Sequence, residues 1–311
     1  MKLVFLDRKS IGSDIDLSKF EAFGEVINYD FTYPDEVEKR IKDADIIVVN
    51  KTLVNEKTIG EAKNLKLVCV TATGTNNLDK EYLDKRGIAW RNVAGYSTDS
   101  VAQHTFALLF YLYEHLPYYD RYVSSKGYMG DKLFTHFERQ FHEISGKTWG
   151  IIGLGAIGQK VAQLAEAFGC KVQYYSTSGK NHNKLYKEVG FDELLKTSDI
   201  VSIHAPLDEN TQGLMNKEAF SMMKKSAVLI NVGRGPIIVE EDLVWAVQNN
   251  QIAGAGLDVL TEEPMSKDCP LTELLEDDRV FITPHIAWAS VEARVRLMDI
   301  IYGQIEEFLN S

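Results

Sequence analysis

Thr-Trp-Gly-Ile-Ile-Gly-Leu-Gly-Ala-Ile-Gly, residues 148–158, joins a short apolar run to the pattern G-x-G-x-x-G, and a helical pattern follows at 159–168. A strand, a glycine turn and a helix in this order are typical of a dinucleotide-binding unit. Gly153 permits the tight turn, Gly155 lets the backbone approach a pyrophosphate, and Gly158 lets helix and strand pack closely. The helix N-terminus would present N–H groups to the anion. A glycine turn can also serve packing alone, but the strand and helix around this one favour dinucleotide binding.

Outward from this turn, short apolar runs alternate with helical patterns along almost the whole chain. Such alternation predicts an α/β fold in which crossover helices join parallel strands. After the midpoint we expect strands at residues 148–152, 171–175, 200–204, 227–231, 255–258 and 280–283. Before it we expect strands at residues 2–6, 26–29, 46–49, 67–70 and 88–91.

Two long helical patterns flank the second series of strands. One runs from about 100 to 116 and is expected to end at Pro117, and the other runs from about 290 to 309. The last helix is amphipathic and could pack back against the first sheet. We therefore predict two doubly wound parallel-sheet domains. A flavodoxin-like substrate domain would hold residues 1–98 plus 287–311, and a Rossmann-type dinucleotide-binding domain would hold residues 99–286.

The composition of the 311 residues excludes several classes of protein. A net charge of -11 disfavours nucleic acid and anionic membranes as partners, because clustered Lys and Arg bind phosphate surfaces. No stretch approaches the ~18 apolar residues of a membrane span, and the start is expected to be a strand and not a signal peptide. The three scattered cysteines suggest neither a disulfide framework nor a metal site. We expect a cytoplasmic protein without a bound metal.

The choice of dinucleotide should be readable after the strand at 171–175, where an acidic residue would bind the ribose 2'-hydroxyl of NAD. This chain has Ser176, Thr177, Ser178, Gly179 and Lys180 there. The hydroxyls and Lys180 would donate hydrogen bonds to a 2'-phosphate, and no negative charge in this segment would repel it. We therefore predict NAD(P) with a preference for NADP, although a serine also tolerates a ribose hydroxyl and Lys180 also suits a solvated loop.

Three segments place polar residues after strands of the second sheet, at 231–235, 256–264 and 283–288. The carboxyl ends of parallel strands share one edge, so these segments should converge. If a bound dinucleotide delivers a hydride to a 2-keto acid, the reaction needs three groups. These are a proton donor, a cation for the carboxylate and a partner that holds the donor. His285 could donate the proton, Glu263 would orient its imidazole and favour the charged form, and Arg234 would bind and polarise the substrate. Taken singly, each residue also fits a solvated loop or a cap.

Residues 153–158, 231–235, 258–264 and 284–285 together resemble the D-isomer-specific 2-hydroxyacid dehydrogenase family over nearly the whole chain. The resemblance implies the catalytic roles just given for Arg234, Glu263 and His285. It implies that Asp258 contacts the nicotinamide carboxamide and that residues 204–206 line the adenosine. It also implies that backbone amides around Gly74 bind the substrate carboxylate. The substrate-binding candidates are Lys51, Thr73, Gly74, Thr75, Arg234 and Trp288. The cofactor-binding candidates are Gly153, Leu154, Gly155, Ala156, Ile157, Gly158, Ser176, Thr177, Ser178, Lys180, His204, Ala205, Pro206, Thr211, Val232, Gly233, Arg234, Asp258, His285 and Ala287.

Within the family, residues 50–52, 95–104 and 286–288 look most like glycerate dehydrogenases, also called hydroxypyruvate reductases. Trp288 beside the acid would narrow the pocket for a short substrate such as hydroxypyruvate or glyoxylate, or it would only pack at the start of the last helix. Phosphoglycerate or formate is an alternative substrate, and Lys51 is the obvious cation for a phosphate. A redox-sensing, corepressor-like module on the same fold is a further alternative. The resemblance also implies a homodimer formed through the aromatic stretch 118–128.

Overall fold

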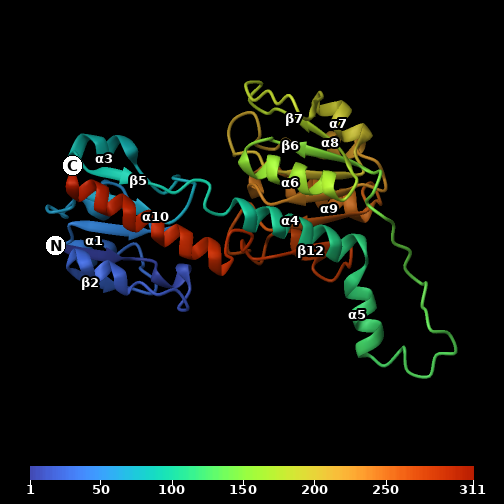
Figure 1. The fold of residues 1–311 in the computed structure, drawn as a ribbon, viewed down its shortest axis with the longest axis horizontal. Coiled ribbons are helices and arrows are strands. Elements are labelled where there is room, and N and C mark those ends of the chain that lie inside the picture. The colour runs from blue at the N-terminus through green and yellow to red at the C-terminus, as the bar shows by residue number, and fades with distance from the viewer. The chain divides into compact units, whose positions relative to one another are not determined.

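The computed structural model describes residues 1–311, which form two compact units (Figure 1). Unit 1 comprises Met1–Ser97 and Ala289–Ser311, and unit 2 comprises Thr98–Trp288. Each unit contains one all-parallel sheet, so the predicted α/β class with two doubly wound domains is confirmed.

The sheet of unit 1 has five strands in the order β2-β1-β3-β4-β5. This is the order of flavodoxin-like sheets. The central strands β3 and β4 are buried along their whole length, as continuous apolar runs in a two-sided parallel sheet should be. The strands are β1 (Lys2–Phe5), β2 (Glu25–Asn28), β3 (Ile46–Val49), β4 (Leu67–Val70) and β5 (Ala89–Arg91). The helical segments are η1 (Arg8–Ile11), η2 (Ser18–Phe23), α1 (Val37–Ile41), α2 (Glu56–Ile59), α3 (Lys80–Arg86) and α10 (Val291–Asn310).

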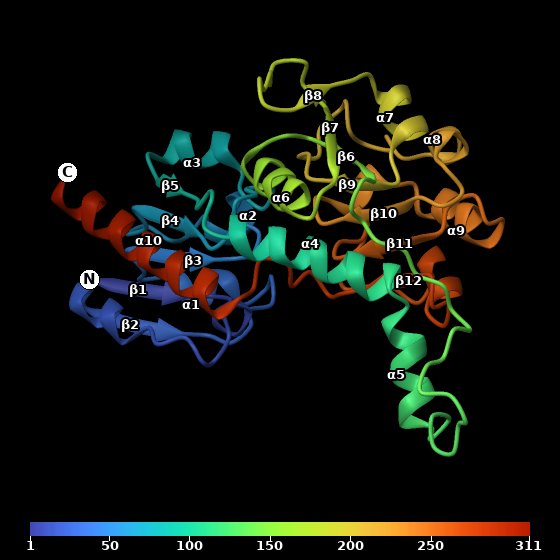
Figure 2. The same cartoon turned by 45° about the vertical axis from the view of Figure 1, so that its right-hand side comes forward.

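Helix α10 returns to unit 1 from the far end of the chain. The Ser290 hydroxyl caps it by accepting from the Ala293 N–H at 3.2 Å. The Tyr302 ring contacts the Phe20 ring, and the Gln304 side-chain amide donates to the Asn92 carbonyl at 2.9 Å. The last helix therefore belongs to unit 1, where it lies beside the first sheet (Figures 1 and 2).

The sheet of unit 2 has seven strands in the order β12-β11-β10-β9-β6-β7-β8. Counted from β6, six of these strands have the 3-2-1-4-5-6 order of dinucleotide-binding sheets, and β12 extends it. The strands are β6 (Thr148–Ile152), β7 (Lys171–Tyr175), β8 (Lys187–Glu188), β9 (Ile200–Ile203), β10 (Val228–Asn231), β11 (Gly254–Leu257) and β12 (Val280–Ile282). The helical segments are α4 (Thr98–Tyr113), α5 (Leu116–Ser124), α6 (Ala156–Ala167), α7 (Phe191–Thr197), α8 (Lys217–Met222), η3 (Gly235–Ile237), α9 (Glu240–Gln248) and η4 (Pro270–Leu274).

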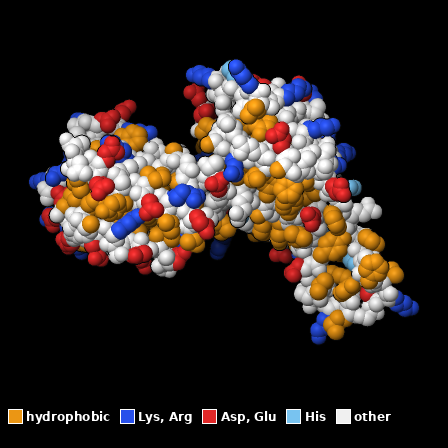
Figure 3. Space-filling view, viewed as in Figure 1, with side chains coloured by type: hydrophobic (Ala, Val, Ile, Leu, Met, Phe, Trp, Pro, Cys, Tyr) orange, Lys and Arg blue, Asp and Glu red, His pale blue; other side chains and the backbone are white.

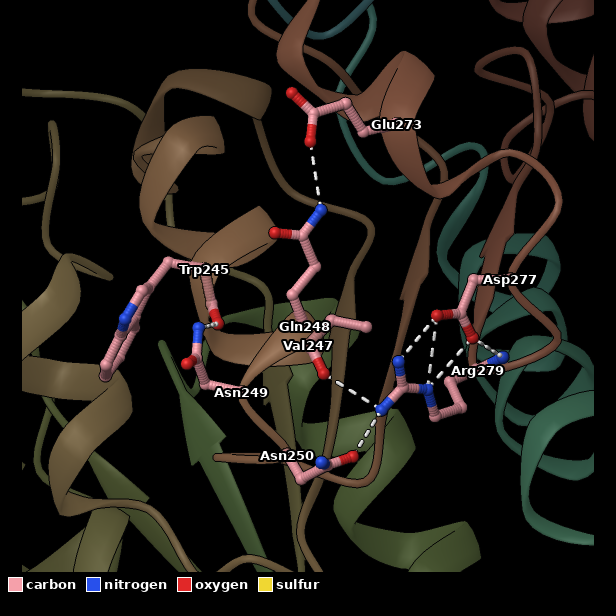
Figure 4. A network of polar contacts seen from close by, with 8 residues as sticks. All are labelled: Trp245, Val247, Gln248, Asn249, Asn250, Glu273, Asp277 and Arg279. Carbon is pink, nitrogen blue, oxygen red and sulfur yellow. Dashed lines mark hydrogen bonds and ion pairs between the residues drawn. The ribbon is translucent and has the colours of Figure 1, made fainter.

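A polar network fastens the amino end of β12 to helix α9 (Figure 4). The Arg279 guanidinium donates to the Val247 carbonyl at 2.9 Å and to Asn250 Oδ1 at 2.7 Å. It also forms hydrogen bonds with Asp277, which hold the pKa of that carboxyl below its usual range. This edge of the sheet is consequently braced by charged side chains that serve the fold.

One local expectation was wrong, and one short strand was missed. Pro117 does not end the connecting helix: α4 ends at Tyr113, and Pro117 lies in the first turn of α5, where its missing N–H costs no helical hydrogen bond. The break falls at His115, whose backbone is left-handed with φ 53°. Strand β8 was not anticipated, because its two exposed residues carry no hydrophobic pattern.

Residues 116–143, which we call the arm, project from the rest of unit 2 (Figures 1 and 2). Helix α5 buries none of its residues. Apolar side chains gather on the arm (Figure 3), and the exposed ones are Leu116, Val123, Tyr128, Met129, Leu133, Phe134, Phe137 and Phe141.

Among the helices of the structure, none is long and apolar enough to cross a membrane.

Candidate active site

Six strands of the unit 2 sheet end in register at its carboxyl edge. Ile152 pairs with Tyr175 and Ile203, Ile203 pairs with Asn231, Asn231 with Leu257, and Leu257 with Ile282. The next residue along each strand therefore lies on one line across the sheet, and these residues are Gly153, Ser176, His204, Val232, Asp258 and Thr283. The expectation that the polar segments converge at one edge is confirmed.

The glycine turn has the geometry that its motif predicts. Gly153 has φ +90°, and a Cβ there would lie 2.8 Å from the Ala205 backbone. A Cβ on Gly158 would overlap the Gly153 carbonyl oxygen, so helix α6 packs directly on the turn. Around a Cβ placed on Gly155, in contrast, no protein atom lies within 4 Å. The turn thus leaves room at the N-terminus of α6, where a pyrophosphate would fit.

His285 and Glu263 form a direct pair in unit 2. The imidazole Nδ1 lies 2.7 Å from Glu263 Oε2, and Glu263 Oε1 accepts from the Leu260 N–H at 3.1 Å. A carboxylate accepts and does not donate, so Nδ1 carries a proton and Nε2 is the atom left for proton exchange. His285 has φ 55°, a left-handed backbone that costs ~1–3 kcal/mol in a residue other than glycine. Surrounding contacts must therefore hold it there.

The loop of Arg234 packs against the loop that leads to Glu263. A Cβ on Gly235 would overlap the Leu260 backbone, so only glycine allows this approach. The buried Glu240 carboxylate accepts from the Thr261 N–H at 2.8 Å and fixes the second loop further. The Arg234 guanidinium is partly exposed and donates to its neighbouring Gly233 carbonyl at 2.7 Å. The structure thus brings together the two loops that carry the predicted cation and the predicted carboxylate.

Asp258 is 1% exposed and binds the segment that carries His285. Its Oδ1 accepts from the Ile286 N–H at 2.8 Å, and its Oδ2 accepts from the Ala287 N–H at 2.9 Å. The Thr283 hydroxyl also donates to Oδ1, at 2.6 Å. Behind them, His104 Nε2 lies 2.9 Å from the Thr283 hydroxyl. Burial lowers the pKa of His104, and the Asp258 charge opposes that shift.

The candidate cofactor residues outside the glycine turn also follow the carboxyl edge. Ser176 is buried, and its hydroxyl accepts from the Asn181 N–H at 3.4 Å, whereas Lys180 is exposed. The Thr211 side chain is fully buried and donates to the Pro206 carbonyl at 2.7 Å, so it supports the 204–206 segment. Trp288 is half-buried and packs against the hydrophobic core of unit 2.

His204 directly follows β9 at the same edge. Its Nε2 lies 2.9 Å from the Ser202 hydroxyl, which accepts from Trp149 Nε1 at 2.8 Å. Its Nδ1 is buried without a hydrogen-bond partner. Burial lowers the pKa of this imidazole to about 3, so His204 is neutral at physiological pH.

The substrate candidates of unit 1 lie at the carboxyl edge of its own sheet. Lys51 follows β3 and is exposed, and the backbone N–H groups of Asn50, Lys51 and Thr52 all donate to Asp7 Oδ2, at 2.7, 3.2 and 3.2 Å. In the turn after β4, the Thr73 hydroxyl donates to the Val93 carbonyl at 2.9 Å. Gly74 and Thr75 complete this turn.

Sequence reasoning did not single out Asp7, His104 or Asn181. Asp7 directly follows a buried strand and accepts three backbone N–H groups, and the Asn181 side chain donates to the Leu154 carbonyl inside the glycine turn at 2.7 Å. A carboxylate after an apolar strand was a readable signal for Asp7. No pattern of neighbouring residues indicates this contact of His104, because its partner Thr283 lies 179 residues away.

Residues 106–287 match the family described as D-isomer specific 2-hydroxyacid dehydrogenase, NAD binding domain. The chain is 39% identical to a hydroxypyruvate reductase of Blautia hydrogenotrophica, over 100% of this chain and 98% of the relative. It is 34% identical to a glycerate dehydrogenase of Methylorubrum extorquens, over 99% and 96%. A solved acyclic imino acid reductase in complex with NADPH and D-Arg superposes with a TM-score of 0.87 at 33% identity, over 100% and 97%.

Proposed function

The chain belongs to the D-isomer-specific 2-hydroxyacid dehydrogenase family, and we propose that it interconverts a small 2-keto acid and its D-2-hydroxyacid with NAD(P)H. Hydroxypyruvate and glyoxylate, which would give D-glycerate and glycolate, are the proposed substrates. The relatives named hydroxypyruvate reductase and glycerate dehydrogenase support this choice. The observation that carries the proposal is the His285–Glu263 pair at the carboxyl edge of a dinucleotide-binding sheet.

Each candidate residue would perform one part of the reaction. A dinucleotide held at the glycine turn would supply or accept the hydride. Arg234 binds the substrate carboxylate and polarises the carbonyl through its fork of N–H donors. His285 donates a proton from Nε2 to the oxygen that becomes the hydroxyl, and Glu263 holds Nδ1 and stabilises the charged imidazolium before transfer. Lys51 and the backbone at 73–75 are proposed to bind substrate, and Trp288 is proposed to limit substrate size.

The cofactor proposal rests on the glycine turn and on the residue after β7. The open space at Gly155 and the N-terminus of α6 suit a pyrophosphate. We propose a preference for NADPH, because Ser176 stands where an acidic side chain would repel a 2'-phosphate and Lys180 lies in the same loop. The solved relative in complex with NADPH supports this direction.

A panel of 2-keto acids assayed in parallel with NADH and NADPH tests both proposals. We expect the highest kcat/KM with hydroxypyruvate or glyoxylate and with NADPH. Faster reduction of branched or bulky keto acids would refute the substrate, and a large preference for NADH would refute the cofactor.

A substitution at Ser176 sharpens the cofactor test. Ser176→Asp keeps an acceptor for the Asn181 N–H but adds a negative charge at the proposed phosphate position. It should lower kcat/KM for NADPH by about tenfold or more and change that for NADH much less, because an unfavourable charge contact costs ~1–2 kcal/mol. Equal losses with both cofactors would show that the residue does not face a 2'-phosphate.

We also propose a cytoplasmic homodimer that is formed through the arm. Phe134 and Phe137 are 87% and 77% exposed, and a monomer rarely exposes such an apolar surface. Light scattering at micromolar concentration should give the mass of a dimer, and the double variant Phe134→Glu with Phe137→Glu should weaken it. A monomer mass for the unmodified chain would refute the dimer, and cell fractionation tests the compartment.

A further inference from the structure

A largely buried hydrogen-bond chain links helix α4 to the segment that carries His285. His104, on α4, lies 2.9 Å from the Thr283 hydroxyl, which lies 2.6 Å from Asp258 Oδ1. Thr283 and Asp258 are 8% and 1% exposed. All three residues belong to unit 2, so their arrangement does not depend on where unit 1 lies.

The direction of each hydrogen bond follows from the chemistry of the groups. The Thr283 hydroxyl has one proton, and the short contact with a carboxylate oxygen uses it. The hydroxyl oxygen must then accept from His104, so the imidazole carries its proton on Nε2. The Asp258 carboxylate in turn accepts the N–H groups of Ile286 and Ala287. Every proton in the chain therefore points toward Asp258.

The carboxylate restrains the residues on both sides of His285. Thr283 precedes the histidine and Ile286 and Ala287 follow it, and the histidine itself has a left-handed backbone with φ 55°. An L residue leaves that conformation unless its neighbours are fixed. Asp258 fixes both neighbours at once, and His104 in turn holds the hydroxyl of Thr283.

We propose that His104 and Thr283 are positioning residues that act through Asp258 to hold the imidazole of His285 against the Glu263 carboxylate. This inference rests on the proposed function only for its kinetic readout. His104 is a partly buried residue of helix α4 and lies 181 residues before the histidine that it positions.

The decisive variant is Thr283→Val, which keeps the shape of the side chain and removes the hydroxyl. We expect kcat to fall on the order of tenfold to a hundredfold, because small displacements of a reacting group have effects of that size. KM for the keto acid and Kd for the cofactor should stay within about twofold, since Arg234 and the glycine turn are untouched. Thr283→Ser should restore kcat. His104→Leu should resemble Thr283→Val, and His104→Gln, whose amide can donate in place of Nε2, should recover part of the loss.

Thr105→Val is the matched control. Thr105 is also a fully buried threonine beside His104, but its hydroxyl donates to the Val101 carbonyl of its own helix. This variant should leave kcat unchanged. An equal loss in Thr105→Val, or a failure of Thr283→Ser to rescue, would show a general packing effect and overturn the inference. A change in cofactor Kd without a change in kcat would also overturn it, because the chain would then serve the nicotinamide site.

Nuclear magnetic resonance separates this inference from the proposed function. The Nδ1–H proton of His285, identified by its loss in His285→Gln, should shift or broaden in Thr283→Val and remain in place in Thr283→Ser. An unmoved signal in Thr283→Val refutes the positioning role whether or not the enzyme turns over. If the unmodified chain reduces no 2-keto acid, the proposed function fails, and this signal still decides the inference.

Discussion

At the carboxyl edge of the unit 1 sheet, Asp7 accepts three consecutive backbone N–H groups of the turn after β3. At the same edge of the unit 2 sheet, Asp258 accepts two backbone N–H groups of the turn after β12, and a threonine hydroxyl as well. Both carboxylates are buried, and each organises a turn that carries a candidate functional residue, Lys51 in one unit and His285 in the other.

The two edges differ in how strongly they constrain the backbone. The unit 2 edge contains the left-handed His285, the left-handed and crowded Gly153, and the close approach of Gly235 to Leu260. The turn that Asp7 holds contains no residue with positive φ. Proton transfer needs one atom at a defined place, whereas binding a carboxylate tolerates small adjustments. The edge that is proposed to perform the chemistry is therefore the one with the more constrained backbone.

The largest expected effect is that of His285→Gln, which removes the proposed acid from the constrained edge. We expect kcat to fall about 10²–10⁴-fold with little change in cofactor affinity, because a positioned acid contributes that much. His182→Gln is the matched control, since His182 also pairs through Nδ1 with a glutamate, at 2.8 Å, in an exposed loop. For both variants, steady-state kinetics measures kcat and cofactor fluorescence measures cofactor affinity. Unchanged turnover in His285→Gln would remove this residue from the mechanism.

A pair of glycine variants measures the difference in backbone constraint. Gly153→Ala meets both a φ of +90° and the Ala205 backbone at 2.8 Å, and we expect it to lower the free energy of unfolding by about 2–5 kcal/mol. Gly87→Ala in unit 1 has a φ of +67° but open space around the new methyl group, so its cost should be about 1 kcal/mol. Chemical denaturation compares them. Equal losses would mean that the unit 2 turn is no more crowded than an ordinary helix end.

Asp7→Asn tests the less constrained edge. The change leaves one acceptor oxygen for a group of donors that includes the Thr52 hydroxyl, and it should lower the free energy of unfolding by about 1–3 kcal/mol. We expect KM for the keto acid to rise several-fold and kcat to change little, because Lys51 would lose its fixed backbone. Asp16→Asn, which alters an exposed carboxylate bonded to Ser18, is the control and should cost less than ~0.5 kcal/mol. A fall in kcat without a rise in KM would contradict this assignment.

The smallest effect concerns pH, and it should arise in unit 2, where all seven histidines lie. Burial lowers the pKa of His204 to about 3, below its value of 6.5 in an unfolded chain. The unfolded state therefore binds this proton more readily, so stability falls as pH decreases below 6.5 and is flat above it. His204→Gln should remove about 1 kcal/mol of the loss that the unmodified protein shows between pH 6.5 and 5.5. Denaturation curves at both pH values measure it, and an identical pH dependence in the variant would refute the assignment.

Much of the fold was readable in advance because strand formation and the glycine turn depend on local patterns. The buried runs at 46–49 and 67–70 became strands with the expected bounds. The expectation failed where short polar segments or a proline could serve two roles. Pro117 begins a helix as readily as it ends one, and only the left-handed backbone at His115 decides between the two. The convergence of Arg234, Asp258 and Thr283 at one edge followed from strand order alone, since parallel strands end together.

Residue types and local spacing were enough to predict the α/β class, the dinucleotide turn and the candidate acid, carboxylate and cation, because these features depend on residues only a few positions apart. The assembled fold alone places Nδ1 of His285 against Glu263, requires glycine at position 235 and lets Asp7 hold the Lys51 turn. It also decided that His104 reaches Thr283. Those contacts join residues tens to hundreds of positions apart, and a pattern of neighbouring residues contains no information about such distances until the sheets have assembled.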